Sequence, residues 1–156
     1  MTKAAAKLAS PEKQLAAFLA RFDPKVASVA RTAIRKLRSR LRGATALVYD
    51  NYNALAVGFG PSERASEAIF SIAVYPRWAS LFFLQGVKLV DPAKLLKGDG
   101  NQVRHIVLKS AADLGTPEIA ALMAQALAKA KKPLDPAQRG RLVIRAISAK
   151  QRPRRP

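Results

Sequence analysis

Four arginines in one predicted helix form the residue set best suited to binding a ligand. They are Arg31, Arg35, Arg38 and Arg42, separated by four, three and four positions. At about 100° per residue, this spacing places their side chains along one side of a helix. Guanidinium groups present paired N–H donors that match phosphate oxygens, so this arginine stripe predicts contact with a polyanion. The alternative is a solvated helix face, which is the commoner origin of such charge runs.

Three further arginines near the C-terminus extend the predicted polyanion-binding set. They are Arg152, Arg154 and Arg155, within the segment AKQRPRRP. This segment has neither apolar periodicity nor acidic residues, so by itself it cannot bury enough surface to offset the entropy of ordering. We therefore expect a flexible basic tail.

The net charge of +18 lies at the two ends of the chain. Residues 1–43 hold 11 basic and 2 acidic side chains, residues 44–128 hold 7 of each, and residues 129–156 hold 10 and 1. Such an excess attracts polyanions such as nucleic acid, and salt weakens the attraction. The distribution predicts an electrically balanced core between two basic segments.

A second candidate site is a pocket formed by Tyr49, Tyr52, Trp78 and Arg104. The two tyrosines flank a predicted turn, where they could line a shallow pocket, although covering the rim of a sheet is their commoner role. Trp78 begins a predicted strand and could stack a base or a ring. At the head of a buried strand, however, a tryptophan is more often a core anchor.

The remaining reactive residue types give no catalytic or metal-binding set. His105 is the only histidine and the chain has no cysteine, so neither a nucleophile with its base nor a thiolate metal site is predicted. Glu63 and Glu67, near Arg64, favour surface ion pairs over a metal site. In GDGNQVRHIVL, residues 98–108, a strand rather than a helix follows the glycines, so a phosphate-binding loop is not predicted. We expect no enzyme activity, no metal and no cofactor.

The elements that position these residues follow from local signals. Ser10-Pro11 and Asp23-Pro24 each combine a capping side chain with a proline at the first helical position, and Gly43 suits the end of the second helix. Thr116-Pro117 begins a last helix in the same way. Asp91-Pro92 predicts a further helix of one to two turns.

Short apolar runs between residues 44 and 109 predict the strands of a small sheet. The fold class is therefore α+β, with an N-terminal helix pair, a small antiparallel sheet of about four to five strands, a C-terminal helix and a basic tail. We expect one domain over residues 8–132 and a basic, largely flexible segment over residues 133–156. No apolar run approaches the length of a membrane span, and the lack of cysteine suits a reducing compartment, so we expect a cytoplasmic protein.

Three motifs in this order resemble the YdhG-like family, a bacterial domain of unknown function. They are AIFSIAVYPRWASLFF, DPAKLLKG and GDGNQVRHIVL, and the resemblance covers roughly residues 11–130. It implies a small intracellular α+β domain, and one branch of the family is regarded as a frataxin-like iron chaperone. Iron handling relies on clustered carboxylates, whereas the seven carboxylates of residues 44–128 are scattered along the chain.

Two functions are therefore predicted from the sequence. The preferred one is a non-enzymatic binding module that associates with nucleic acid or another polyanion through its basic ends. The alternative is a small-ligand or iron-handling domain of the frataxin-like type.

Overall fold

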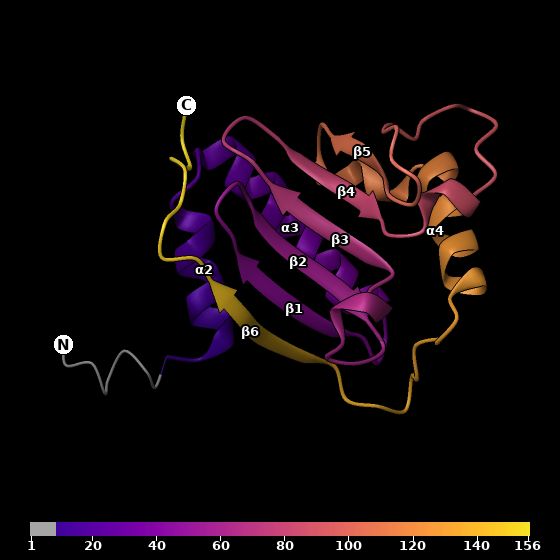
Figure 1. The fold of residues 1–156 in the computed structure, drawn as a ribbon, viewed down its shortest axis with the longest axis horizontal. Coiled ribbons are helices and arrows are strands. Elements are labelled where there is room, and N and C mark those ends of the chain that lie inside the picture. The colour runs from indigo at the N-terminus through magenta and orange to yellow at the C-terminus, as the bar shows by residue number, and fades with distance from the viewer. Residues whose placement is uncertain (1–8) are drawn as a thin grey trace.

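A six-stranded mixed sheet forms the centre of the computed structural model, which describes residues 9–156 (Figure 1). Its strands are β1 (Thr45–Asp50), β2 (Leu55–Gly60), β3 (Phe70–Val74), β4 (Ala79–Phe83), β5 (Arg104–Leu108) and β6 (Arg141–Ile147). The spatial order is β5-β4-β3-β2-β1-β6, and only the β1–β6 pair is parallel. The predicted α+β class is confirmed, with one strand more than the upper estimate.

Among the described residues, three α-helices accompany the sheet: α2 (Pro11–Ala20), α3 (Pro24–Arg40) and α4 (Pro117–Lys129). Two of the predicted caps are present, since the Ser10 and Asp23 side chains accept hydrogen bonds from the first-turn N–H groups of α2 and α3. Thr116 does not cap α4, because its hydroxyl donates to the Asp113 carbonyl instead. Gly43 follows α3 with a φ of 82°, and a Cβ at this position would overlap the Asp135 carbonyl. Glycine is therefore required there for both backbone conformation and space.

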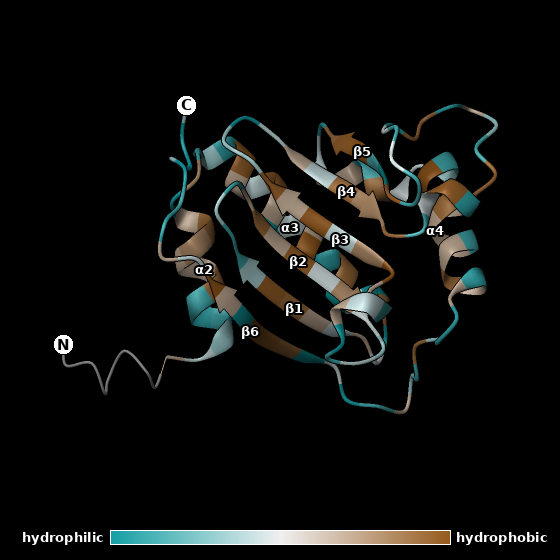
Figure 2. Ribbon diagram, viewed as in Figure 1, coloured by the Kyte–Doolittle hydropathy of each residue, from teal (hydrophilic) through white to brown (hydrophobic). Residues whose placement is uncertain are grey.

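The helices cover one face of the sheet and leave the other without a helical layer. Figure 1 shows α3 passing behind the strands. On that side Val48, Val57, Ile72 and Leu81 are cross-strand neighbours, and each is 0% exposed. They form one hydrophobic core with the buried residues of α2, α3 and α4. In Figure 2 apolar residues are concentrated on the strands, while the chain after β6 is hydrophilic.

The C-terminal segment is the main difference from the sequence-based domain boundary. Residues 141–147 form β6, which pairs with β1 and places Leu142 in the core. The chain then remains attached to the end of the β1–β2 hairpin, since the Ser148 and Arg152 N–H groups donate to the carbonyls of Asp50 and Tyr52. The expected flexible segment over residues 133–156 thus contributes a strand to the domain, because pairing with β1 satisfies backbone groups that the isolated segment could not.

The helix predicted at Asp91-Pro92 is absent, and a turn occupies residues 91–97 instead. The Asp91 carboxylate accepts hydrogen bonds from the N–H groups of Leu95 and Leu96, and Lys94 has a left-handed φ of 54°. Side-chain capture of two N–H groups offers the backbone an alternative to helical hydrogen bonding. None of the helices that the structure describes is long and apolar enough to cross a membrane.

Candidate functional site: an arginine-lined groove

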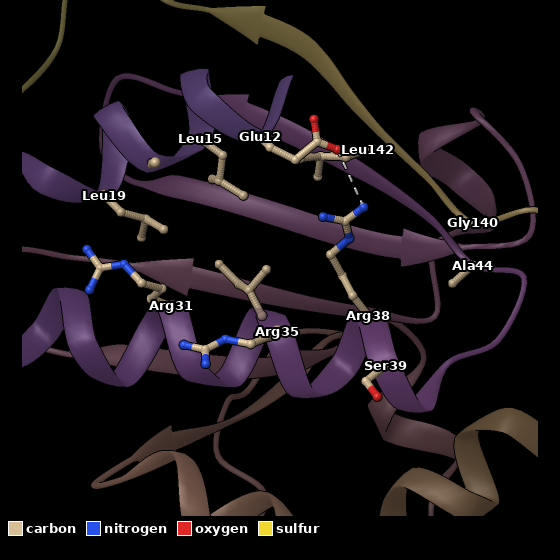
Figure 3. Close-up of a pocket in the computed structure, with 12 residues that line it drawn as sticks. Glu12, Leu15, Leu19, Arg31, Arg35, Arg38, Ser39, Ala44, Gly140 and Leu142 are labelled. Carbon is tan, nitrogen blue, oxygen red and sulfur yellow. Dashed lines mark ion pairs between the residues drawn. The ribbon is translucent and has the colours of Figure 1, made fainter. Parts of the chain in front are cut away.

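A groove of about 480 Å³ lies between α2, α3 and the start of β6 (Figure 3). Arg31, Arg35 and Arg38 line it from α3, and Leu15 and Leu19 line it from α2. Leu142 of the edge strand β6 and Gly140, directly before that strand, also line it. We call this cavity the arginine groove. The N-terminal helices supply its charged side chains, and the C-terminal segment supplies only these two uncharged residues.

The position of the arginines follows from the register of α3. Its apolar residues Ala30, Ala33 and Leu37 face the sheet and are 0% exposed. Arg31, Arg35 and Arg38 lie on the adjoining side and are exposed, whereas Ile34 between them is buried in the groove floor. The helical period therefore places three guanidinium groups above an apolar base.

The charge in the arginine groove is only partly balanced. Glu12 is the one carboxylate that lines it, and its Oε1 lies 3.8 Å from a guanidinium nitrogen of Arg38. Both side chains are exposed, so this pair holds Arg38 only weakly. Arg31 and Arg35 form no ion pair with any residue in the range 9–156.

The fourth residue of the arginine stripe lies outside this cavity. α3 ends at Arg40, and Arg42 is exposed in the turn that follows. The helical spacing that predicted four aligned arginines therefore holds for three of them.

Arg154 differs from the sequence-based expectation of an exposed polyanion contact. It is 4% exposed, and its guanidinium donates to Asp50 Oδ1 at 2.9 Å and to the Asn51 carbonyl. The same group lies 5.6 Å from the centre of the Phe22 ring, in a cation–π arrangement. Asp50 is 1% exposed, so the pair is buried and Arg154 is unavailable to an external ligand.

The other two tail arginines remain at the surface. Arg155 donates to the carbonyls of Ala20 and Arg21, at the C-terminal end of α2, where positive charge is favourable. Arg152 is exposed. Of the three tail arginines, one therefore fixes the fold, one caps a helix and one stays in solvent.

The four residues of the predicted aromatic pocket do not converge. Tyr49 and Trp78 share the sheet face that lacks helices, whereas Tyr52 lies in the β1–β2 turn. Arg104 starts β5 opposite Phe83, on the helix side, and donates to the carbonyls of Gly100 and Val103. Trp78 is 43% exposed, so its preferred interpretation as a core anchor is wrong.

A second cavity of about 510 Å³, which the sequence did not predict, lies between the ends of β3 and β4 and α4. Ile69, Phe83 and Leu89 supply apolar surface, and Gln85 and Gln102 supply amide groups. Four lysines also line it: Lys88, Lys129, Lys131 and Lys132. These residues come from segments far apart in the chain, so no local motif marks them.

Glu63 and Glu67, the two carboxylates considered for a metal site, are engaged with basic side chains. Glu63 pairs with Arg141 at 2.9 Å, and Glu67 pairs with Lys132 at 3.3 Å. The Ser62 hydroxyl, followed by Lys132, lowers the pKa of Glu67 below its ordinary value. Ion pairs are present as predicted, but the partners are Arg141 and Lys132 rather than the neighbouring Arg64. Within residues 9–156, no three His, Asp or Glu side chains are grouped to hold a metal ion.

No family model, curated protein or solved structure matches this chain. The resemblance to the YdhG-like family therefore stays a prediction.

Proposed function

We propose that this protein is a polyanion-binding module that holds phosphate groups of nucleic acid in the arginine groove. The observation that carries this proposal is the alignment of Arg31, Arg35 and Arg38 along one wall of a cavity with a single carboxylate. Each guanidinium can donate two parallel hydrogen bonds to a phosphate. Three of them at helical spacing suit consecutive phosphates of a chain better than one small anion.

The electrostatic field of the whole chain supports this assignment. The net charge of +18 raises the local concentration of any polyanion and speeds its encounter with the protein. The tail contributes less than the sequence predicted, because Arg154 is neutralised by Asp50. The binding surface is therefore centred on α3, with Arg152 as an exposed charge beyond it.

Salt dependence of nucleic-acid binding tests the proposal. A fluorescently labelled duplex of about 20 base pairs is titrated with the protein, and anisotropy is followed at 50 and 200 mM salt. Release of counterions from several phosphates predicts an affinity that falls tenfold or more over this range. Absence of binding at 50 mM salt, or an affinity independent of salt, would contradict the proposal.

The second cavity supports an alternative function, the binding of a small anionic ligand. Lys88, Lys129 and Lys131 supply positive charge, whereas Lys132 is paired with Glu67, which also lines the cavity. Gln85 and Gln102 supply donors and acceptors above an apolar base. A nucleoside monophosphate carries both features such a cavity would recognise, a planar polar ring and a phosphate. Titration with adenosine monophosphate should then shift the side-chain amide resonances of these two glutamines, and unchanged resonances count against this function.

Iron handling is the remaining family-based alternative. Ferrous iron would have to displace Arg141 from Glu63 or Lys132 from Glu67. Saturable binding of ferrous iron that disappears in Glu63→Gln or Glu67→Gln would support this function, and a titration without heat or spectral change would remove it.

A further inference from the structure

The sheet face without a helical layer carries several aromatic side chains, among them the exposed Trp78. Cross-strand pairing places Tyr49, Ala56, Ala73, Ser80 and Val107 in one row. It places Leu47, Gly58, Ser71, Phe82 and His105 in the next row. Figure 1 looks onto this face. The two rows contain no carboxylate.

Small residues occupy the middle of this sheet face. They are Ala56 and Gly58 on β2 and Ser71 and Ala73 on β3. The loop before β3 reaches the face at Gly58, where an added Cβ would lie 3.7 Å from the Ala68 Cβ. The rings of β4 and β5 lie beside these small residues.

Two pairs of stacked rings lie on the β4 side of this face. Tyr75 and Trp78 stack with their centroids 5.0 Å apart, and Phe82 and His105 stack at 5.1 Å. The Tyr75 N–H donates to the Trp78 carbonyl at 2.8 Å, which extends the β3–β4 pairing and keeps both rings on this face. We call these four residues the aromatic face. Trp78 is 43% exposed, and the other three rings are half-buried.

Basic residues flank the aromatic face without ion pairs. Arg77 lies in the turn between Tyr75 and Trp78, and Lys109 directly follows β5; both are exposed. Neither forms an ion pair with a residue of the described chain. Exposed rings next to unpaired cations are the combination that single-stranded nucleic acid recognises, because bases stack on the rings while phosphates approach the cations.

We propose that the aromatic face binds unpaired bases of a single-stranded nucleic acid, with Trp78 as the principal stacking residue. The ligand class rests on the proposed function, but the surface is separate, since the arginine groove lies on the helix side of the sheet. The groove takes phosphates of any nucleic acid, and the aromatic face adds a preference for unpaired strands. Duplex DNA keeps its bases stacked on one another and cannot use the rings.

Trp78 is the only tryptophan, so its fluorescence reports on this face directly. The wild-type protein is titrated with 12-nucleotide oligo(dT), oligo(rU) and a duplex of equal length, and binding is followed in parallel by anisotropy of a labelled strand. Stacking predicts saturable quenching by one or both single strands at the concentration where anisotropy rises, and little quenching by the duplex.

Variants of Trp78 distinguish base stacking on this ring from electrostatic attraction of nucleic acid to the whole protein. Trp78→Ala should weaken single-strand binding by about fivefold to a hundredfold and change duplex affinity less than twofold. Trp78→Phe, which keeps a ring, should restore most of the loss. Val90→Ala, at an exposed apolar position elsewhere, is the control and should bind like wild type.

Three outcomes would overturn this inference. Binding of single strands with unchanged Trp78 fluorescence would leave the proposed function intact and place the ligand in the groove alone. Absence of any anisotropy change would remove the proposed function as well. A concentration-dependent shift of Trp78 emission without nucleic acid would show that a second copy of the chain covers this face.

Discussion

The arginines of α3 and the arginines of the C-terminal tail look equivalent in the sequence and differ in the fold. Arg31 and Arg35 are exposed beside a groove and form no ion pair within residues 9–156. Arg154 is buried and bound to Asp50 at 2.9 Å. A basic residue thus stays exposed or stabilises the fold depending on whether the chain brings a buried carboxylate to it. The net charge of the chain does not distinguish the exposed arginines from the buried, paired one.

The largest expected effect comes from breaking the buried pair. Arg154→Ala removes the buried cation of Asp50 and leaves only the more exposed Arg21, 3.7 Å from Asp50 Oδ2, as its partner. This change should cost about 3–5 kcal/mol of unfolding free energy. Thermal denaturation should show a fall in Tm on the order of 10 °C. Arg155→Ala, which removes the neighbouring exposed arginine, is the control. It should lower the unfolding free energy by less than about 1 kcal/mol.

Removal of both members of that pair sharpens the comparison. The double variant Arg154→Met with Asp50→Leu should recover most of the stability lost by Arg154→Ala, because no uncompensated charge remains. If Arg154→Ala alone leaves Tm unchanged, the tail does not fix the fold and the distinction between the two arginine sets disappears.

The α3 arginines should show the opposite behaviour. The triple variant Arg31→Gln, Arg35→Gln and Arg38→Gln should retain its Tm within a few degrees, because these side chains are exposed. Its affinity for a DNA duplex should fall about tenfold to a thousandfold at 50 mM salt. The slope of log affinity against log salt should flatten by up to about 3.

A matched triple variant controls for net charge. Lys94→Gln, Lys97→Gln and Lys150→Gln remove the same charge from exposed positions outside the arginine groove. This variant should lose much less affinity than the α3 variant. Equal losses would mean that binding follows total charge, and the groove would have no special role.

A smaller effect is expected from the one carboxylate of the groove. Glu12→Gln removes the partner of Arg38 and leaves three uncompensated arginines. Duplex affinity at 50 mM salt should rise about twofold to fivefold, in line with the modest energy of an exposed ion pair. Asp23→Asn, which removes one negative charge outside the groove, is the control. A rise of equal size in that control would assign the effect to net charge.

The smallest effect is expected at the surface Glu67–Lys132 pair, in which the glutamate is half-buried and the lysine exposed, in contrast to the buried Asp50–Arg154 pair. The pKa of Glu67 is lowered in the folded state, first by Ser62 and then by Lys132. Its stabilising contribution is therefore complete above the ordinary glutamate pKa and is lost as the pH falls through the lowered pKa. An NMR titration of the side-chain carboxyl should give a midpoint below that of an unstructured glutamate, and Lys132→Gln should raise it.

Several features of the fold were predictable because their causes are local. The caps at Ser10 and Asp23 and the glycine after α3 depend on neighbours within a few residues, and the structure confirms them. The prediction of a helix at Asp91-Pro92 was wrong, although the sequence pattern behind it was also local. The Asp91 side chain can cap a helix or close a turn, and the sequence did not distinguish these outcomes.

The candidate sites were predictable only in part. The spacing of Arg31, Arg35 and Arg38 correctly placed them on one side of α3, but the groove exists because α2 and β6 pack beside that side. Strand alternation placed Trp78 and Phe82 on one face of the sheet. It did not show that this face lacks a helical layer, so Trp78 was expected in the core.

The sequence by itself determined the helices, the alternating strands, the basic ends and the spacing of the α3 arginines, since each depends on residues close together along the chain. Only the tertiary structure decided that residues 141–147 pair with β1, that Asp50 neutralises Arg154, and which sheet face stays open. These outcomes depend on contacts between segments separated by about a hundred residues. Their energies come from pairing and burial that no local pattern records.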